Sequence, residues 1–597
     1  MAPTAHDRST TLLLCGLTFL LGTYKSELRQ LGGDLLGHEP EDASCAVRSA
    51  PSAGSEAPPA DPSAQRGHLQ FLVVGAGPAG LQYAILMQEA GMEYAVLEKG
   101  SGVGSFFRHY PRARRLISVN KLNVGANKSD EFALRHDWHS LLRANYTMSE
   151  FSNKYFPQAD ELVEYLETVS QDLDGHIELD TEVLGTRWDG RRHVVRTNRG
   201  VFTCDHLVMA TGYRMRDLPE CMRESGAAVY TYEDFPDVRD SNEEWCRNKA
   251  MMVMGSGNAA FETADMVANC AKSVSLVYKN KPRYSHITHY VGDVRIHNAG
   301  ILDRYQLKSL DALEDMDMVQ DWSTPDGLCK WAKKMVNQHN VDAFIFAGGF
   351  TTQRTNLVNA TLRDGKRKFP DLQAFWSSPE SPQTWFGGAA MHGEDFRVSA
   401  GGFVHGFRYA VRSQFRFMRL RHLNKPWPSK RYQSPRLSAS EKEPRTLSVD
   451  PQLPAHFVGR IQEASGLYQM QDFLVDVIEF SHTHQGAVRY YEEVPKKWLR
   501  NVTECRACMT IGFLYSQKEK WNFDLLYSNE RLVGDSGKPG LFLHPILEGW
   551  VNGSRVAEIH VREDLDGEWV SKKFVDELEG AFSKVTKTIL EALEGGK

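Results

Sequence analysis

The sequence predicts an α/β fold of two doubly wound domains, one inserted into the other, followed by an α+β appendage. A strand, a glycine-rich turn, a helix and a second strand follow one another twice, and an apolar segment ending in small residues comes after each copy. The length of 597 residues fits three or four folded units. The net charge of -6, with both signs interspersed, gives no indication of nucleic-acid binding.

The N-terminal region predicts targeting and not a folded domain. Residues 11–21 form an apolar run after Arg8, shorter than the roughly 20 residues that span a bilayer and typical of the apolar core of a signal peptide. Residues 1–24 are therefore predicted as a signal peptide, with a short anchor as the alternative. Residues 25–67, rich in Pro, Ala, Ser and Glu, predict a disordered linker.

The first copy of the repeated pattern begins with an apolar strand at residues 69–74. The glycine-rich turn occupies residues 75–80, a helix is expected over 81–90, and a second strand over 94–98 ends in an acid. This unit of about thirty residues is typical of a Rossmann-like dinucleotide-binding βαβ unit.

Each part of this unit has a physical role. Gly75 permits the tight turn, Gly77 lets the backbone approach a pyrophosphate, and Gly80 lets the helix pack closely on the strand. The phosphates would face the positive end of the helix near Pro78, and Glu98 would accept hydrogen bonds from ribose hydroxyls. The residues predicted to bind this dinucleotide are Gly75, Gly77, Pro78, Ala79, Gly80, Glu98 and Lys99.

The second copy has a strand at residues 250–254, a turn at 255–260, a helix over 261–268 and a strand over 273–278. Its last strand is followed by Lys279 where an NAD site carries an acid. Cations at this place attract the 2′-phosphate of NADP, whereas an acid would repel it. The residues predicted to bind NADP are Gly255, Gly257, Asn258, Ala259, Lys279, Lys281 and Arg283. The alternative is a solvated basic loop beyond a nucleotide fold that has lost its ligand.

Apolar segments at residues 207–212 and 342–349 are predicted to return the chain to the first domain. A segment at residues 384–388 and a glycine-rich stretch at 399–403 then precede a helix over 403–422. A helix opened by glycines can contact an anion or a flavin ring, although it can equally be only a helix start. The additional predicted flavin contacts are Thr211, Gly212, Gly388, Gly401 and Gly402.

Nine cysteines are too few for a disulfide scaffold in a chain of this length. Cys221, Cys246 and Cys270, like most of the others, are predicted to be small buried thiols. Cys505 and Cys508 form a CxxC, which at a helix end can lower a thiol pKa, so they are a candidate redox pair. The alternatives are a local structural disulfide and two unlinked thiols. No second CxxC or His pair completes a metal site, and none is predicted.

Glycosylation sequons are compatible with a secretory location and do not establish it. They begin at Asn127, Asn145, Asn359, Asn501 and Asn552.

The motif order at residues 75–80, 210–212 and 255–260 resembles the flavoproteins with two dinucleotide-binding domains, which include flavin monooxygenases and disulfide reductases. Longer strings resemble the FAD-dependent oxidoreductase domain-containing protein 2 family. They lie at residues 105–112, 135–138, 288–293, 305–311, 399–403, 405–409, 465–470 and 542–545.

The resemblance implies an FAD-binding Rossmann-like domain with an inserted NADP-binding Rossmann-like domain, and FAD and NADPH as cofactors. The predicted units are a signal peptide or short anchor at residues 1–24, a linker at 25–67, the first part of the FAD-binding domain at 68–214, the NADP-binding domain at 215–340, the return segment of the FAD-binding domain at 341–430 and the appendage at 431–597.

The resemblance also implies a flavoprotein of the endoplasmic-reticulum lumen that assists degradation of misfolded glycoproteins. Its implied partners are degradation factors of this compartment or a disulfide-exchange protein, with no nucleic acid and no multi-pass membrane region. Residues 594–597 are not KDEL-like, so we expect a secretory-pathway location without a C-terminal retrieval signal.

The sequence does not identify the acceptor to which a bound flavin would pass its electrons. The chain has no histidine between His206 and His286, where flavin monooxygenases have their F-x-G-x-x-x-H stretch. It also has no CxxC in the predicted NADP domain or soon after the first glycine-rich turn, where disulfide reductases have their redox cysteines. We therefore hold two hypotheses: an NADPH-dependent oxidoreductase with an unidentified acceptor, and an FAD-stabilised binding or adaptor protein without turnover. A flavin monooxygenase-like N- or S-oxygenase is a further alternative.

Overall fold

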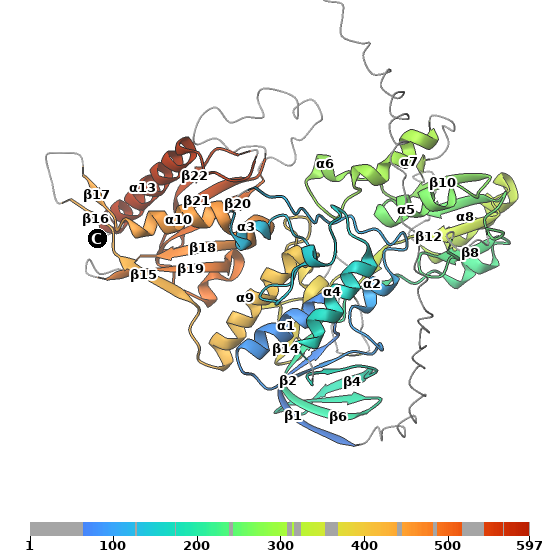
Figure 1. The fold of residues 1–597 in the computed structure, drawn as a ribbon, viewed down its shortest axis with the longest axis horizontal. Coiled ribbons are helices and arrows are strands. Elements are labelled where there is room, and N and C mark those ends of the chain that lie inside the picture. Colours follow the sequence, from blue (N-terminus) through green and yellow to red (C-terminus); the bar gives the residue numbers. More distant parts are fainter. Residues whose placement is uncertain are drawn as a thin grey trace, which may run out of the picture. The chain divides into compact units, whose positions relative to one another are not determined.

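The structure is a computed structural model, and the fold described below belongs to the compact unit Pro59–Lys597 (Figure 1). The described residues are 64–125, 128–173, 175–237, 243–306, 313–315, 324–352, 357, 368–438, 445–480, 486–515, 542–564 and 566–595. The predicted signal peptide, nearly all of the predicted linker, and the sequons at Asn127 and Asn359 lie outside these residues. Within them, no helix is both long and apolar enough to cross a membrane.

The first domain is built on a seven-stranded sheet with the order β3-β2-β1-β6-β5-β4, in which β14 also pairs with β6. The strands β1, β2, β3, β6 and β14 pair in parallel, whereas β5 pairs antiparallel with both β6 and β4. The bounds are β1 Gln65–Val74, β2 Tyr94–Leu97, β3 Ile177–Glu178, β4 Val183–Trp188, β5 His193–Thr197, β6 Gly200–Met209 and β14 Thr384–Phe386. Its main helices are α1 Pro78–Glu89, α4 Ala159–Gln171 and α9 Val404–His422.

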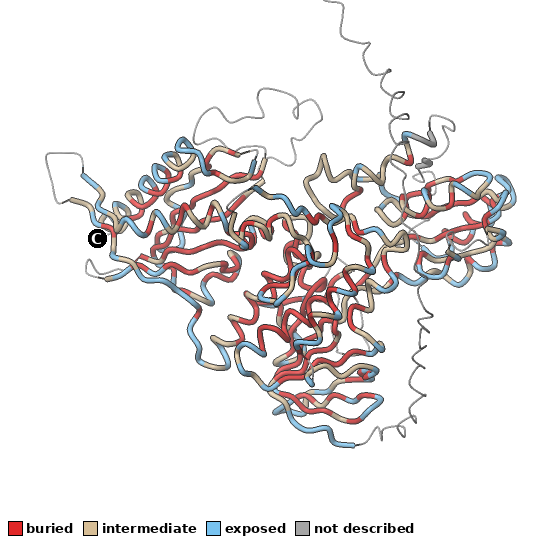
Figure 2. The backbone as a smooth tube through the Cα atoms, in the orientation of Figure 1, coloured by how far each residue is buried: buried red, intermediate tan, exposed pale blue. Residues whose placement is uncertain are grey.

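This sheet confirms the first predicted βαβ unit. The helix begins at Pro78, three residues earlier than predicted and at the place where the phosphates were expected. The predicted segment at residues 384–388 supplies β14, which aligns with β6 and so returns the chain to the first sheet. Figure 2 shows the strands of the sheets as mostly buried.

The second domain is a five-stranded sheet, all parallel, with the order β11-β10-β9-β12-β8. The bounds are β8 Ala228–Thr231, β9 Ala250–Met254, β10 Ser273–Tyr278, β11 Leu313–Asp315 and β12 Ala343–Phe346, with α5 Asn258–Val267, α7 Ile296–Gln306 and α8 Pro325–His339.

One predicted boundary is wrong. The segment at residues 342–349 was expected to return to the first domain, but β12 pairs with β9 and β8 and completes the second sheet. The segments at residues 207–212 and 342–349 look alike because each supplies a strand that pairs with the first strand of a βαβ unit. β6 pairs with β1, and β12 pairs with β9. The NADP domain therefore extends past residue 340.

Two disulfides correct the prediction of isolated buried thiols. Cys221 is bonded to Cys329, and Cys246 to Cys270, with Cα separations of 5.8 and 5.7 Å. Both lie within the second domain and span 108 and 24 residues of sequence. Separations this irregular carry no spacing signal, and for that reason the sequence did not reveal the pairs. Among the described cysteines, only Cys204 is unbonded, and it is buried.

The C-terminal region is an α+β domain, as predicted. Its sheet is antiparallel, with the order β15-β19-β18-β20-β21-β22, and helices α10 and α13 pack together beside it. The bounds are β15 Ser429–Gln433, β18 Leu474–Glu479, β19 Ala487–Pro495, β20 Ala507–Leu514, β21 His544–Val551, β22 Ser554–His560, α10 Gln452–Glu463, α11 Ser465–Gln469 and α13 Lys572–Gly595. The β-branched and almost entirely buried run at residues 474–479 forms β18, directly after the short helix α11.

A buried arginine joins this appendage to the first domain. Arg135 donates hydrogen bonds to the carbonyl oxygens of Gly567 at 2.7 Å and Ile461 at 2.6 Å. Its guanidinium also lies 4.8 Å from the ring centroid of Tyr468. A buried guanidinium needs such partners, so this contact fixes the appendage on the first domain.

Candidate functional site

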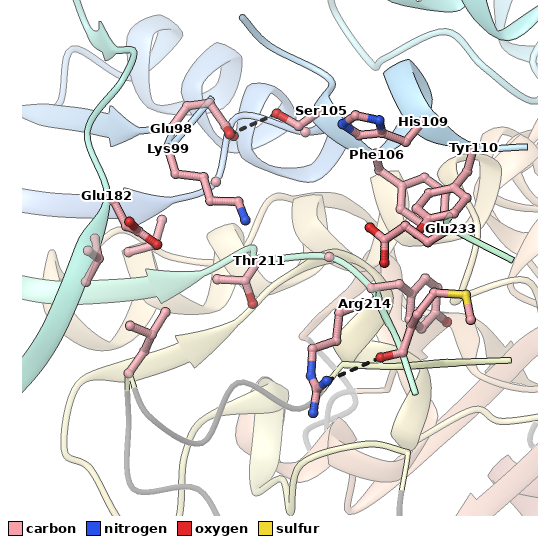
Figure 3. Close-up of a pocket in the computed structure, with 18 of the residues that line it drawn as sticks. Glu98, Lys99, Ser105, Phe106, His109, Tyr110, Glu182, Thr211, Arg214 and Glu233 are labelled. Atoms are coloured by element: carbon pink, nitrogen blue, oxygen red, sulfur yellow. Dashed lines mark hydrogen bonds between the residues drawn. The ribbon is translucent and has the colours of Figure 1, made fainter. Parts of the chain in front are cut away.

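A cavity of about 1230 Å³ lies at the carboxyl end of the first parallel sheet (Figure 3). This is the edge at which open α/β sheets bind ligands, and the volume exceeds the roughly 300–1,000 Å³ of a site for a drug-sized molecule. Six residues predicted to bind the first dinucleotide line it: Gly75, Gly77, Glu98, Lys99, Thr211 and Gly212.

Two glycines of the first turn are required by the fold. Gly75 has φ +107°, and a Cβ there would stand 2.5 Å from the carbonyl oxygen of Ala210. A Cβ on Gly80 would stand 1.9 Å from the carbonyl oxygen of Gly75. These two positions therefore admit only glycine, whether or not a ligand is bound.

Gly77 differs from both. It is the N-cap of α1 with φ -79° and ψ -177°, an extended conformation open to any residue. Apart from its two chain neighbours, no residue of the described chain comes within 4 Å of the place where its Cβ would be. The fold does not require glycine here, and the open space adjoins the helix N-terminus and the cavity. This observation fits a pyrophosphate held against the backbone of Gly77.

Glu98 is 5% exposed and nearly saturated with hydrogen bonds from the protein. Its Oε2 accepts from the Ala76 N–H at 2.8 Å, and its Oε1 accepts from the Gly100 N–H and the Ser105 hydroxyl, both at 2.9 Å. A carboxylate has about four acceptor positions, so Oε2 keeps one for a ribose hydroxyl. The hydrogen bonds of Glu98 therefore leave room for a ribose hydroxyl, and its role in binding a dinucleotide stays a prediction.

Three predicted flavin contacts do not line the cavity. Gly388 packs against Ala79, since a Cβ there would stand 2.7 Å from the Ala79 methyl. A Cβ on Gly401 would stand 2.4 Å from a carboxylate oxygen of Asp395, and one on Gly402 would stand 2.6 Å from the His392 ring. Close packing therefore accounts for glycine at these three positions, and the flavin contact of each stays a prediction. Pro78, Ala79 and Gly80 likewise lie in the first turn of α1, behind the cavity wall.

The far wall of the cavity is formed by residues that no sequence motif predicted. Tyr213, Arg214 and Arg216, which directly follow the small-residue turn after β6, line it together with Glu233 of the second domain. The charged residues Arg214 and Glu233 extend toward the cavity opposite Glu98 (Figure 3). The signal available in the sequence was that Tyr213, Arg214 and Arg216 directly follow Gly212, a predicted flavin contact. The cavity therefore extends from the first glycine-rich turn, at Gly75 and Gly77, to Glu233 of the second domain.

The second glycine turn repeats the geometry of the first. Gly255 has φ +155°, and a Cβ there would stand 2.5 Å from the carbonyl oxygen of Ala347. Gly257 is the N-cap of α5 in an extended conformation, and apart from its two chain neighbours no described residue comes within 4 Å of its Cβ position. Lys279, Lys281 and Arg283 follow β10 and are exposed. A second phosphate site at this helix N-terminus is therefore open.

Asn258 has a role that the sequence did not indicate. Its Nδ2 donates to the carbonyl oxygen of Asp293 at 2.9 Å, and its Oδ1 accepts from the Arg295 N–H at 2.8 Å and from Asn298 at 3.0 Å. The side chain predicted to contact NADP instead ties α5 to the segment that leads into α7. Only its backbone and one amide hydrogen remain for a nucleotide.

Glu262 on α5 gives the second domain a pH-dependent stability. Burial raises the pKa of its carboxyl from 4.5 to about 7, although hydrogen bonds from Asn298 and Tyr232 oppose the shift. Because the folded pKa is the higher one, this contribution is fully present below pH 4.5 and is lost as pH rises toward 7. We expect the free energy of unfolding to fall by up to about 3 kcal/mol over this range from Glu262 alone.

Urea denaturation of the wild type, Glu262→Gln and Asp265→Asn between pH 4.5 and 8 measures this contribution. Glu262→Gln should remove most of the slope, whereas Asp265→Asn, an exposed position on the same helix, should keep it. Equal slopes in all three proteins would refute the assignment.

The candidate redox pair Cys505 and Cys508 is a local disulfide in the appendage, with a Cα separation of 5.2 Å. Cys508 lies in β20, an internal strand, and is fully buried, while Cys505 is 8% exposed. The pair is thus at the start of a strand and not at a helix end, so no helix N-terminus lowers a thiol pKa there. Its surroundings favour the structural alternative over the redox one.

Comparison with known proteins agrees with this geometry. Residues 72–388, just over half of the chain, match the family model described as pyridine nucleotide-disulphide oxidoreductase. FAD-dependent oxidoreductase domain-containing protein 2 of Mus musculus is 34% identical over 533 residues, covering 81% of this chain and 76% of the mouse protein. Its counterpart from Danio rerio is 31% identical, covering 71% and 67%.

Among solved structures, a double variant of a flavin monooxygenase from Stenotrophomonas maltophilia covers 58% of this chain and 98% of its own, with 15% identity and a TM-score of 0.44. On the family model and the two relatives, the chain belongs to the pyridine nucleotide-disulphide oxidoreductases and, within them, to the FAD-dependent oxidoreductase domain-containing protein 2 family.

Proposed function

We propose that the chain is an FAD-containing oxidoreductase that receives reducing equivalents from NADPH and passes them to a separate acceptor. The observation that carries this proposal is the pair of N-cap glycines, Gly77 and Gly257, each of which adjoins open space at a helix N-terminus beside a parallel sheet. Backbone N–H groups at such ends bind phosphates. The isoalloxazine ring of bound FAD would accept a hydride and release its electrons singly or in pairs.

The choice of NADPH over NADH rests on Lys279, Lys281 and Arg283. All three are exposed and follow the strand whose end, in an NAD site, carries an acid. A 2′-phosphate placed among three cations would gain charge-assisted hydrogen bonds that NADH cannot make.

A secretory location is part of the proposal. Three disulfides in the described residues fit an oxidising compartment such as the endoplasmic-reticulum lumen, because cytosolic thiols are kept reduced. In that compartment we infer a role in degradation of misfolded glycoproteins, with degradation factors or a disulfide-exchange protein as partners.

One observation favours the second candidate, an FAD-stabilised binding protein without turnover. None of the residues that line the cavity is a cysteine, and Cys204, the unbonded one among the described cysteines, is buried with its thiol pKa raised by burial. The residues that line the cavity therefore include no redox-active thiol of the kind through which disulfide reductases pass electrons from the flavin. The appendage would then be the functional surface.

Anaerobic reduction separates the two candidates. Mixing the purified yellow protein with NADPH under argon should bleach the flavin absorbance near 450 nm if the chain is an oxidoreductase, and admitting oxygen or another acceptor should restore it. A flavin that dithionite bleaches but excess NADPH leaves yellow would favour the binding protein.

A further inference from the structure

The second domain is joined to the first by two chain segments that pair with each other. The chain leaves the first domain through β7 (Arg214–Met215) and returns through β13 (Phe350–Thr351), and these short strands form an antiparallel ribbon. Two crossings that lie side by side form a hinge, and a hinge of a few residues lets a domain rotate. The orientation of the second domain therefore depends on contacts outside this ribbon.

Arg112 of the first domain makes such a contact. Its guanidinium donates to the carbonyl oxygens of Glu233 at 2.5 Å and Phe235 at 2.6 Å, and it lies 4.5 Å from the ring centroid of Phe235. Its backbone N–H donates to the Tyr232 hydroxyl at 3.1 Å. One residue thus makes three hydrogen bonds to residues 232–235, which directly follow β8 of the second domain.

Tyr110 adds a second contact from the same segment. Its ring stacks on that of Tyr232, with centroids 5.8 Å apart, and its hydroxyl is hydrogen-bonded to the Glu233 carboxylate. Tyr110 and Tyr232 are both buried, so water does not compete freely for these contacts. Tyr110 and Glu233 lie together at one end of the cavity and both line it (Figure 3). The contact between the two domains is therefore part of the cavity wall.

Hydrogen bonds continue from this contact to the helix that follows the second glycine turn. The Tyr232 hydroxyl is also hydrogen-bonded to the Glu262 carboxyl on α5. Asn298 donates to the Glu262 carboxyl and to the Asn258 side chain, each at 3.0 Å. Asn258 is the first residue of α5, next to the open N-cap Gly257. The cavity wall and the N-terminus of α5 are therefore connected through side chains of the second domain.

The cavity also reaches the edge of the second sheet at which a nucleotide would bind. The strands β8, β9 and β12 are parallel, so the carboxyl end of β8, at Thr231, and that of β9, before Gly255, lie at the same edge. Thr231 lines the cavity. Because β12 lies between β8 and β9, two strand spacings, roughly 10 Å, separate the ends of these strands. The open phosphate position at Gly257 therefore lies on the edge that borders the cavity.

We propose that Arg112 is a positioning residue for hydride transfer from NADPH to the flavin. By holding residues 232–235 at the cavity wall, it fixes the second domain in the orientation in which a nucleotide bound at Gly257 reaches the flavin site. The proposal rests on the oxidoreductase function proposed above. Arg112 is not among the residues that line the cavity, so it acts through the orientation of the domain and not by contact with the flavin.

The step that depends on this orientation is a two-electron transfer. A C–H bond of the reduced nicotinamide breaks, and a hydride, which carries two electrons and one proton, passes to the flavin. NADPH is thereby oxidised to NADP⁺ and the flavin is reduced, with no further reactant. A transfer of this kind requires the two reacting atoms to be close and aligned, so its rate is sensitive to the placement of the second domain.

The test compares the full-length, FAD-containing wild type with Arg112→Ala. We expect the limiting rate of flavin reduction at saturating NADPH, followed anaerobically by stopped flow, to fall about tenfold or more, because a small misplacement of the reactants slows transfer steeply. The dissociation constant of NADP⁺, measured by titration calorimetry, should stay at the wild-type value. The rate of flavin reduction by dithionite should also be unchanged.

Three further variants make the result specific. Arg108→Ala removes a guanidinium from the same segment whose ion pair with Glu167, at 2.5 Å, lies within the first domain, and it should match the wild type. Arg112→Lys keeps the charge but loses the fork of donors, so it should recover only part of the rate. Tyr232→Phe keeps the buried ring and removes only the hydroxyl. It should slow reduction in the same direction, and it tests the same contact if Arg112→Ala does not fold.

A readout without turnover accompanies the kinetics. Small-angle X-ray scattering of the oxidised protein without nucleotide should give a larger radius of gyration for Arg112→Ala than for the wild type, because a freed domain samples orientations away from the cavity. A wild-type limiting rate in Arg112→Ala, an unchanged radius of gyration, or a loss of NADP⁺ affinity in place of the rate would overturn the positioning role. Failure of NADPH to bleach the wild-type flavin would count against the proposed function, and the scattering comparison would then still decide whether Arg112 holds the second domain.

Discussion

Replacing Gly77 with valine is expected to yield a folded protein that purifies without FAD. The position has extended backbone angles and no described neighbour within 4 Å of its Cβ, so a branched side chain fits the protein without strain. The same side chain would occupy the space in which a pyrophosphate meets the N-terminus of α1. We expect at least a thousandfold loss of FAD affinity, about 4 kcal/mol, read as a flavin-to-protein absorbance ratio near zero.

Two matched variants make this result specific. Gly257→Val places the same side chain at the equivalent open N-cap of the second domain, and should retain FAD while losing reduction by NADPH. Gly80→Val should fail to fold, since its Cβ would meet the Gly75 carbonyl oxygen at 1.9 Å. A yellow, normally melting Gly77→Val protein would remove the first fingerprint as the FAD site.

The sequence contained enough to predict both βαβ units, because a glycine turn between an apolar strand and a helix is a local signal. Gly75 and Gly255 have the positive φ values, and Gly77 and Gly257 the open N-caps, that the motifs imply. The position of Glu98 could be predicted for the same reason, since its distance along the chain from Gly77 is set by one helix and one strand.

What escaped prediction depends on contacts between distant segments. The disulfide Cys221–Cys329 joins residues 108 apart, and β12 was assigned to the wrong sheet because β6 and β12 have the same local pattern. Asn258 was predicted to contact a ligand because it follows Gly257 in the glycine turn, while its side-chain hydrogen bonds go to residues 35 and more positions away. The side chains of Tyr290 and His392 are hydrogen-bonded although they are 102 residues apart, and no sequence spacing predicts this contact.

NADPH is expected to bind this protein ten to a hundred times more tightly than NADH, and Lys279→Glu should abolish most of that preference. Lys279 is exposed directly after β10, at the end where the second glycine turn lies. One charge-assisted hydrogen bond to the 2′-phosphate contributes about 1.5–3 kcal/mol, and a glutamate would add repulsion. The measurement is the concentration of each nucleotide that half-saturates the rate of anaerobic flavin reduction.

Lys272→Glu is the matched control, because it makes the same charge change before the opposite end of β10. It should leave the nucleotide preference as it is, so that a general effect of net charge is separated from contact with the phosphate. Added salt should also narrow the preference in the wild type, since exposed ion pairs are screened at high ionic strength, whereas Lys279→Glu should respond little. The hypothesis would be contradicted if NADPH and NADH had equal half-saturating concentrations in the wild type and these were unchanged in Lys279→Glu. Lys279, Lys281 and Arg283 would then not contact a 2′-phosphate, and the second domain would have no preference for NADP.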